Sequence, residues 1–157
     1  FQCNGCPDNC CTSLFYHHTH IEQAFLRYGF SKLPMARQAE IRHRSSDYCR
    51  RTFSDSNEAK SLKLLCPANE NEQCLLYPYR PMICRLHGLP HELHRPGGPV
   101  VNGPGCDAGH FTTGSARLDR TPFYREMARI ELAYRQSENL TDKTKLTVAQ
   151  ILLSCGD

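Results

Sequence analysis

The stretch that decides the fold is CNGCPDNCC, residues 3–11, which places four cysteines within nine residues. The last two, Cys10 and Cys11, are neighbours in the chain. Thiols as crowded as these can form disulfides, bind a single metal ion or bind a cluster of several metals. Each of these would tie the amino-terminal segment to other parts of the chain. The chemistry of the cysteines therefore decides both what stabilises the fold and what the protein does.

The composition indicates one domain with a modest hydrophobic core. The chain has 157 residues, a usual length for a single domain. Leu, Ile, Val and Phe together make up only about a fifth of it, and it has no Trp. Chains with so few large apolar residues approach the composition of disordered proteins. Because the chain also has ten cysteines, we expect a single cysteine-rich domain over residues 1–157 that is stapled by them.

Charge and hydropathy narrow the range of partners. The net charge is only +3 with histidine neutral, which is too small to indicate nucleic-acid binding. The sequence has no run of 18 apolar residues that could span a membrane and no recognisable signal peptide. We expect a cytoplasmic protein that binds no nucleic acid, has no membrane span and has another protein, such as a redox partner, as its partner.

Helix caps and hydrophobic periodicity predict two helices in the first third of the chain. The first spans residues 19–29, where Thr19 and Glu22 fit a capping box and Gly29 is a natural stop. The residues expected on its buried face are Ile21, Phe25 and Tyr28. The second spans residues 34–52, because a proline suits the first helical turn.

The carboxy-terminal part, residues 119–157, is also expected to be helical. A helix over residues 121–138 carries apolar residues at spacings of three and four, the pattern of one buried stripe. The members of this stripe are Phe123, Met127, Ile130 and Tyr134. A short helix over residues 147–154 begins with a second capping box, formed by Thr147 and Gln150.

Residues 66–110 are crowded with proline and glycine. These residues mark turns and loops, so regular structure is unlikely to extend beyond short turns. Residues 94–105 in particular are expected to form a surface loop. The predicted fold class is mostly α: a small helical domain with a loop-rich centre that is held by cysteine-bound metal, with little or no β-sheet.

The cysteine spacing leaves three interpretations open, of which the first is a set of disulfides. The cysteine density is below that of small secreted scaffolds. Neighbours such as Cys10 and Cys11 also cannot easily bridge each other, because their Cβ vectors diverge.

The second interpretation is zinc. Cys3 and Cys6 form a C-x2-C half-site, whose turn places two sulfurs about 2.3 Å from one ion, but the chain has no second such pair.

An iron–sulfur cluster is the third interpretation. Its irons bind thiolates one by one, so ligands can come from scattered positions. A single tetrahedral ion would have difficulty using both Cys10 and Cys11, whereas two irons of one cluster, or two adjacent sites, would not. On the residues alone, zinc and iron–sulfur are supported almost equally.

Three stretches of the sequence resemble the cysteine-rich CxxCxxCC family (YkgJ-type), which is described as zinc- or iron-chelating. The first is the block from Cys3 to Cys11. The second is CLLYPYRPMICR, residues 74–85, preceded by Cys66; it looks like the C-x-I/L-Y-x-x-R-P-x-x-C-R core of the family. The third is Cys106 in its Gly- and Pro-rich surroundings. The motif-bearing part is thus residues 3–106, and the resemblance covers the last third of the chain only weakly.

The resemblance implies metal binding through eight cysteine thiolates. They are Cys3, Cys6, Cys10, Cys11, Cys66, Cys74, Cys84 and Cys106. The shared string also implies that Arg80 and Arg85 surround the site, compensating its charge and donating N–H groups to thiolate or sulfide. Two departures from the family pattern are the three residues before the vicinal pair, where relatives have two, and His87-Gly88, where relatives have aromatic residues and proline.

Other reactive side chains suggest less specific roles. Cys49 and Cys155 have no match in the family pattern and are expected to be free, buried thiols. His91 and His94 are three residues apart, a spacing that suits a shared metal only on a helix. His17, His18 and His20 follow the first cysteine block closely and, with His87, His91, His94 and His110, could form a second metal site. Most histidines are expected to be solvated or hydrogen-bonded locally. Since no nucleophile or paired carboxylate accompanies the cysteines, no catalytic residue is predicted.

The sequence therefore predicts a metal-binding protein, with an iron–sulfur cluster of the 4Fe-4S type favoured by the vicinal cysteines and by the arginines beside Cys84. It would act in electron transfer, redox sensing or metal handling. One alternative is a structural domain that binds Zn²⁺ in two four-cysteine sites and mediates protein interaction. Another is an enzyme or enzyme accessory with a supporting cluster, because some lysine N-methylases of flagellin carry a similar cysteine set.

Overall fold

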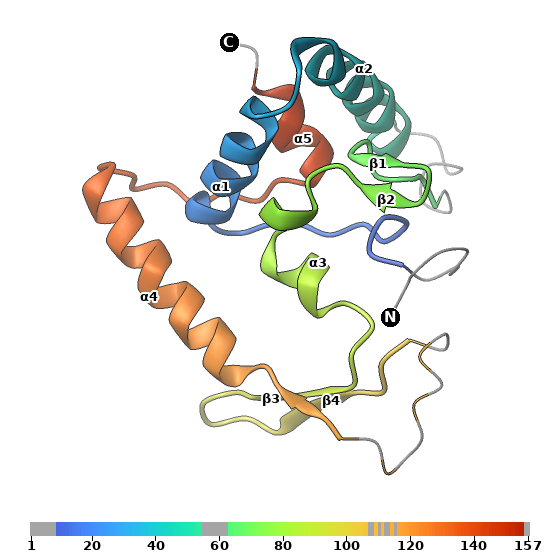
Figure 1. Cartoon of the computed structure of the whole chain (residues 1–157). Coiled ribbons are helices and arrows are strands. Elements are labelled where there is room, and N and C mark those ends of the chain that lie inside the picture. Colours follow the sequence, from blue (N-terminus) through green and yellow to red (C-terminus); the bar gives the residue numbers. More distant parts are fainter. Residues whose placement is uncertain are drawn as a thin grey trace.

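The computed structural model describes residues 9–54, 63–106, 109, 111, 114 and 116–155. In Figure 1, the helices α1, α2 and α5 lie together at one end of the molecule, next to the strands β1 and β2, while β3 and β4 lie at the other end. The elements follow in the order α1 (His20–Ser31), α2 (Met35–Thr52), β1 (Asn69–Glu70), β2 (Gln73–Cys74), the 3-10 helix η2 (Tyr77–Tyr79), α3 (Met82–Leu86), β3 (His91–His94), β4 (Val100–Gly103), β5 (Leu118–Asp119), α4 (Thr121–Ser137) and α5 (Val148–Leu153).

The expectation of a mostly α fold with little or no sheet is wrong. In the described part of the chain, five α-helices are accompanied by two small sheets, and the structure is 47% helical and 12% strand. One sheet is the hairpin of β1 and β2, and the other has the strand order β4-β3-β5, with β3 antiparallel to β4 and parallel to β5. The fold is therefore mixed α/β.

The larger sheet lies where proline and glycine predicted a surface loop. His91 pairs with Gly103, and His94 pairs with Val100. The prolines and glycines of residues 95–99 form the turn between the two strands. There Gly97 has φ +68°, a left-handed conformation that glycine adopts without steric cost. The turn residues were recognised from the sequence, but the short strands on both sides of them were not.

The four predicted helices are confirmed, and their ends lie at most two residues from the predicted ones. Gly29 does not end α1, which continues to Ser31. The glycine is required for packing instead, because a Cβ atom at this position would lie 2.2 Å from Cγ of Tyr79. Gly29 thus lets η2 lie directly against α1.

The two predicted capping boxes have different outcomes. The box at the start of α5 is confirmed: the Thr147 hydroxyl accepts from the Gln150 amide at 3.3 Å, and the Gln150 side chain accepts from the Thr147 amide at 2.9 Å. The box at the start of α1 is wrong. The Thr19 hydroxyl donates to Glu22 and makes no capping hydrogen bond to the helix.

A residue from α4 caps α1 instead. The carboxylate of Glu131 accepts from the backbone amides of His20 and Ile21, each at 3.0 Å. The first amides of a helix have no partner within the helix, and a negative charge is favourable there. The amino-terminal end of α1 is therefore satisfied by a residue that is distant in the sequence.

The core lies between α1, α2 and α5. It consists of Leu26, Phe30, Ile41, Ala68, Leu76, Ile151 and Leu152. The apolar faces predicted for α1 and α4 do not lie in it: Phe25 is 44% exposed and Phe123 is 45% exposed. Both line a largely apolar groove of about 350 Å³ between α1, α3 and α4. The periodicity located these helices correctly, but five of the seven predicted stripe residues border the groove, and none lies in the core.

No helix in the described part of the chain combines the length and the apolar character that crossing a bilayer would require.

Candidate metal centre

Five of the eight implied cysteine ligands line one cavity of about 40 Å³. They are Cys10, Cys11, Cys66, Cys74 and Cys84. They come from three parts of the chain: the segment before α1, the region of β1 and β2, and α3. All five are free thiols. The structure therefore brings the vicinal pair together with cysteines that are more than fifty residues away in sequence.

The other implied ligands are placed differently. Cys106 is buried, lies outside the residues that line the cavity and packs against Gly88, where a Cβ atom would be 3.1 Å from its sulfur. Cys3 and Cys6 lie outside the described residues. Cys49 and Cys155 are half-buried free thiols, and neither lines the cavity. The Cys155 thiol donates to the carbonyl of Ile151 at 3.2 Å.

A local turn presents the vicinal pair to the cavity. The side-chain oxygen of Asn9 accepts from the amide of Cys11 at 2.8 Å and from that of Thr12 at 3.1 Å. Asparagine often bends the backbone in this way. The Cys11 carbonyl then accepts from the Cys66 amide at 2.7 Å, so a backbone hydrogen bond joins the first two cysteine segments.

Cys74 is placed by the tight hairpin of β1 and β2, in which it pairs with Asn69. The two turn residues, Asn71 and Glu72, have φ of 48° and 65°. Two consecutive left-handed residues are typical of a two-residue hairpin turn. The turn thus directs the chain back so that Cys66 and Cys74 lie on the same cavity.

Cys84 is positioned by the start of α3. The carboxylate of Glu22, on α1, accepts from the Met82 amide at 2.7 Å. Pro81 precedes this helix and lines the cavity; its fixed φ suits the entry to a helical turn. The contact between Glu22 and Met82 anchors α3, and with it Cys84, to α1.

The thiols strongly influence one another. The hydrogen bond with Cys10 and burial raise the pKa of Cys11 far above its usual value. At Cys10 the hydrogen bond with Cys11 lowers the pKa, but the hydrogen bond with Cys84 and burial outweigh it and raise the pKa to about 11. Burial is the main cause that raises the pKa of Cys66 and of Cys74. These groups are therefore thiols at neutral pH unless a cation drives out their protons, as metal ions do.

Among the described residues that line the cavity, Arg80 is the one arginine or lysine. Its charge opposes the rise in pKa at Cys10, Cys11 and Cys74. It lines the cavity, and its guanidinium carbon lies 3.7 Å from the centroid of the Tyr77 ring. Arg85 does not line the cavity. Its guanidinium donates to the backbone carbonyls of Arg80, at 2.8 Å, and of Pro78, which holds the turn before α3.

The cavity also contains His17, which the sequence offered only as one of seven histidines for a separate metal site. His17 is 2% exposed and lines the cavity with the five cysteines. Its Nε2 is buried and has no hydrogen-bond partner among the described residues. Burial lowers the pKa of His17, although the charge of Glu22 opposes this, so its imidazole is neutral at neutral pH. Thiols with a neutral imidazole are a donor set that zinc and iron clusters both accept.

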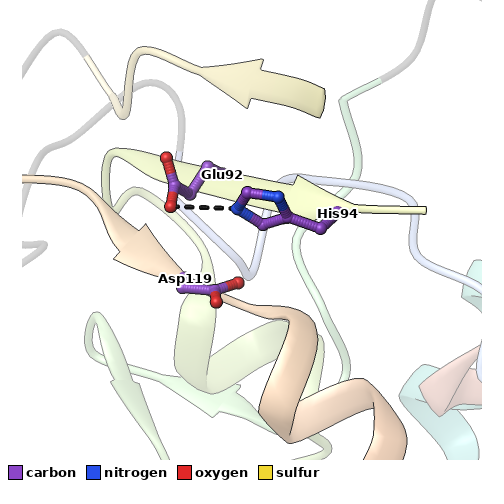
Figure 2. Close-up of side chains that lie close together, drawn as sticks. All are labelled: Glu92, His94 and Asp119. Atoms are coloured by element: carbon purple, nitrogen blue, oxygen red, sulfur yellow. Dashed lines mark hydrogen bonds and ion pairs between the residues drawn. The ribbon is translucent and has the colours of Figure 1, made fainter. Parts of the chain in front are cut away.

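A second group of ligand-type side chains lies on the larger sheet. Figure 2 shows Glu92 and His94 on β3 and Asp119 at the end of β5. One ligand atom of each lies within 4.8 Å of the others; in the described residues this is the one group that meets this spacing, so the cavity sulfurs are less closely gathered. Ligation of a metal in the cavity would have to draw those sulfurs together.

The residues of this second group already have partners. His94 Nε2 and Glu92 Oε1 are 3.1 Å apart, and Asp119 accepts from the Thr121 amide at 2.8 Å. The histidine pair considered from the sequence does not form a site here. Because residues 91–94 form a strand, His91 and His94 point to opposite faces. The signal that was overlooked is the spacing of two between Glu92 and His94, which places them on one face of a strand.

Comparisons with known proteins give this site no relative: no family model matches the chain, and no curated protein and no solved structure shows significant similarity to it. The resemblance to the CxxCxxCC family therefore stays a prediction that rests on the cysteine motifs.

Proposed function

We propose that this protein binds metal through cysteine thiolates, most favourably as an iron–sulfur cluster, and acts in electron transfer, redox sensing or metal handling. The observation that carries the proposal is the convergence of five cysteines, from three separate segments, on one small cavity. Free cysteines are often buried as small apolar residues, but five of them from three segments around one cavity is the arrangement that a shared ligand requires, and all five are free thiols.

The vicinal cysteines favour a cluster over a single ion. A structural zinc ion and a four-iron cluster each take four protein ligands, so the five cysteines that line this cavity do not by their number separate the two. The neighbours Cys10 and Cys11 both belong to it, and their short spacing suits two different metal atoms. In a cluster each iron takes its own thiolate, so vicinal cysteines can both serve.

The surroundings of the thiols also support this proposal. Thiolate ligands around a cluster give the site a net negative charge, which a nearby cation offsets, and N–H groups that donate to sulfur raise the reduction potential. Arg80 offers both a charge and N–H donors at the wall of the cavity. The remaining wall is largely apolar, with residues such as Leu26, Leu76 and Ala149, and would limit the access of water.

The test is elemental analysis and visible absorbance of protein purified without oxygen. We expect iron and sulfide in stoichiometric amounts and a brown colour, with broad absorbance at about 400 nm. The double variant Cys10→Ser/Cys11→Ser should lose the colour, while Cys49→Ser, which removes a thiol outside the cavity, should keep it. A colourless protein with stoichiometric zinc would favour the structural zinc domain and exclude the redox role.

The groove beside the cavity favours a second candidate, an enzyme or enzyme accessory in which the cluster has a supporting role. Arg80 and Pro81 line both the cavity and the groove, whose volume of about 350 Å³ is in the range of small-molecule sites. The groove carboxylates have other partners: Glu22 accepts from α3, and Glu126 pairs with Arg129 at 2.6 Å. A visible spectrum that shifts when small apolar molecules are titrated into the metal-loaded protein would support this candidate.

A further inference from the structure

We propose that His17 is a further ligand of the metal site, binding through Nε2 to the metal that the cysteines of the cavity hold. This inference rests on the proposed metal binding and adds a nitrogen ligand that belongs to none of the cysteine motifs. The site would then be a mixed thiolate and imidazole centre.

The first argument is the unsatisfied nitrogen. His17 is 2% exposed, and its Nε2 has no hydrogen-bond partner among the described residues. Buried polar atoms are almost always paired, since leaving one without a partner destabilises the fold. The histidine lies on the wall of the cavity that also holds the five cysteines. A metal in this cavity would provide the missing partner once it has drawn this nitrogen and the sulfurs together, since no three of these ligand atoms among the described residues lie within 4.8 Å of one another.

The second argument is that the backbone of His17 is held firmly in place. Its amide donates to the carbonyl of Leu146 at 2.7 Å, and its carbonyl accepts from the amide of Leu146 at 3.1 Å. These two bonds form an isolated β-bridge between the segment before α1 and the segment before α5. The adjacent Thr147 also lines the cavity. A side chain on a backbone fixed from both sides is well suited to hold a ligand atom at one position.

The third argument is chemical. A neutral imidazole nitrogen binds zinc at about 2.0–2.1 Å and replaces cysteine on iron in some clusters, where it raises the reduction potential. The alternative is a structural role in which the ring only fills space beside Leu26 and Thr147. That alternative leaves the nitrogen without a partner, and the two roles differ in whether the nitrogen contacts metal.

The experiment compares the full chain with three variants: His17→Ala, His17→Cys and His18→Ala. His18 is the matched control, because it is the neighbouring residue and is exposed. The metal of the anaerobically purified protein is measured first. If it is iron, pulsed EPR of reduced protein containing ¹⁵N-labelled histidine reports a directly bound nitrogen. If it is zinc, X-ray absorption separates a nitrogen at about 2.0–2.1 Å from sulfur at about 2.3 Å.

We expect the nitrogen signal in the wild-type protein and in His18→Ala, and its loss in His17→Ala. We also expect His17→Ala to bind the metal at least about ten-fold more weakly, the lower end of what the loss of a supporting contact causes. His17→Cys supplies a thiolate in place of the imidazole and should recover metal content without the nitrogen signal. This recovery separates the loss of a ligand from a failure to fold.

The outcomes distinguish this inference from the proposed function. A wild-type protein that binds metal but shows no histidine nitrogen overturns the role of His17 and leaves the cysteine site standing. A nitrogen signal that persists in His17→Ala does the same, because another histidine must then supply it. A wild-type protein that binds neither iron nor zinc overturns both.

Discussion

At Gly29 a single hydrogen atom in place of a side chain determines how closely η2 can pack against α1. A Cβ atom there would lie 2.2–2.6 Å from three atoms of Tyr79, far closer than atoms in contact can be. Alanine is favoured over glycine within a helix by about 1 kcal/mol, so propensity alone predicts that Gly29→Ala stabilises α1. The packing predicts the opposite.

We expect Gly29→Ala to lower the free energy of unfolding by about 1–3 kcal/mol, the usual cost of overpacking. Urea denaturation followed by circular dichroism measures this difference. Gly98→Ala is the control, because the nearest side-chain atom to its added Cβ would be at an ordinary 3.6 Å. If Gly29→Ala is as stable as the wild type, the close contact with Tyr79 does not stabilise the fold.

At Asp119 one carboxylate connects the larger sheet to the start of α4. It accepts from the Thr121 amide at 2.8 Å, and its hydrogen bonds with Thr121 lower the pKa of Asp119 below its usual value. A group whose pKa is lower in the folded protein stabilises the fold above its unfolded-state pKa, and that stabilisation is lost as the pH falls through the folded-state value. The loss is therefore expected in the acidic range, below the usual Asp pKa of about 3.9.

Asp119→Asn can still accept a hydrogen bond, so we expect it to retain part of the stability that this contact supplies near neutral pH. We also expect the stability of this variant to depend less on pH in the acidic range than that of the wild type. Asp119→Ala should lose the contact at every pH. Thermal melting over a series of pH values compares the three proteins. Identical pH profiles for wild type and Asp119→Asn would show that this carboxylate does not contribute.

Among the elements, α3 depends on α1 for its position. It has only five residues, and helices this short are not stable alone. The hydrogen bond from the Met82 amide to Glu22 anchors its first turn, and Cys84 lies in its middle. The position of one proposed metal ligand therefore depends on a carboxylate that is sixty-two residues away in the sequence.

We expect Glu22→Ala to weaken metal retention by about ten-fold or more, as loss of a contact that orients a ligand does, while Glu126→Ala on the other side of the groove leaves it unchanged. Competition with a chelator of known affinity measures both. If Glu22→Ala retains metal as well as the wild type, then α3 keeps its position without this contact.

For the molecule as a whole, we expect the proposed metal to be a main source of stability, because the core is small. The buried core consists of a few side chains between α1, α2 and α5, while the segments that carry the cysteines have little regular structure. Since metal binding contributes directly to folding in such domains, we expect removal of the metal under reducing conditions to lower the melting temperature by roughly 10 °C or more, given about 2–4 °C per kcal/mol at this size. An unchanged cooperative transition after complete removal would show that the metal does not stabilise the fold.

The sequence predicted features that depend on residues close together in the chain, and it did not predict contacts between residues that are far apart in it. The cap of α5 was predicted correctly because Thr147 and Gln150 are three residues apart. The partner of Glu22 was missed because the Met82 amide is distant in the sequence, and the same holds for Glu131 at the start of α1. The sheet was missed because its strands are short and flank a turn whose residues suggested only a loop.

In the candidate site, too, the residues with a local sequence pattern could be predicted and the residue placed by a distant contact could not. The cysteines that share the cavity all carry motif spacing that could be recognised in the sequence. His17 carries none, because its place in the cavity follows from its bridge to Leu146, which is 129 residues later in the chain. No periodicity or spacing reports such a contact. Its signal appears only when the two segments are seen side by side.

The position of α5 also has a consequence for the order of events during synthesis. Val148 and Ala149 line the cavity, and Ile151 and Leu152 fill the core beside it. A ribosome has therefore made every cysteine of the cavity well before it makes the residues that enclose them. At about 5–20 residues per second, the thiols spend several seconds exposed before the enclosure can form. The proposed metal site can therefore close only after residues 146–152 have emerged, and we expect its thiols to be open to oxidation until then.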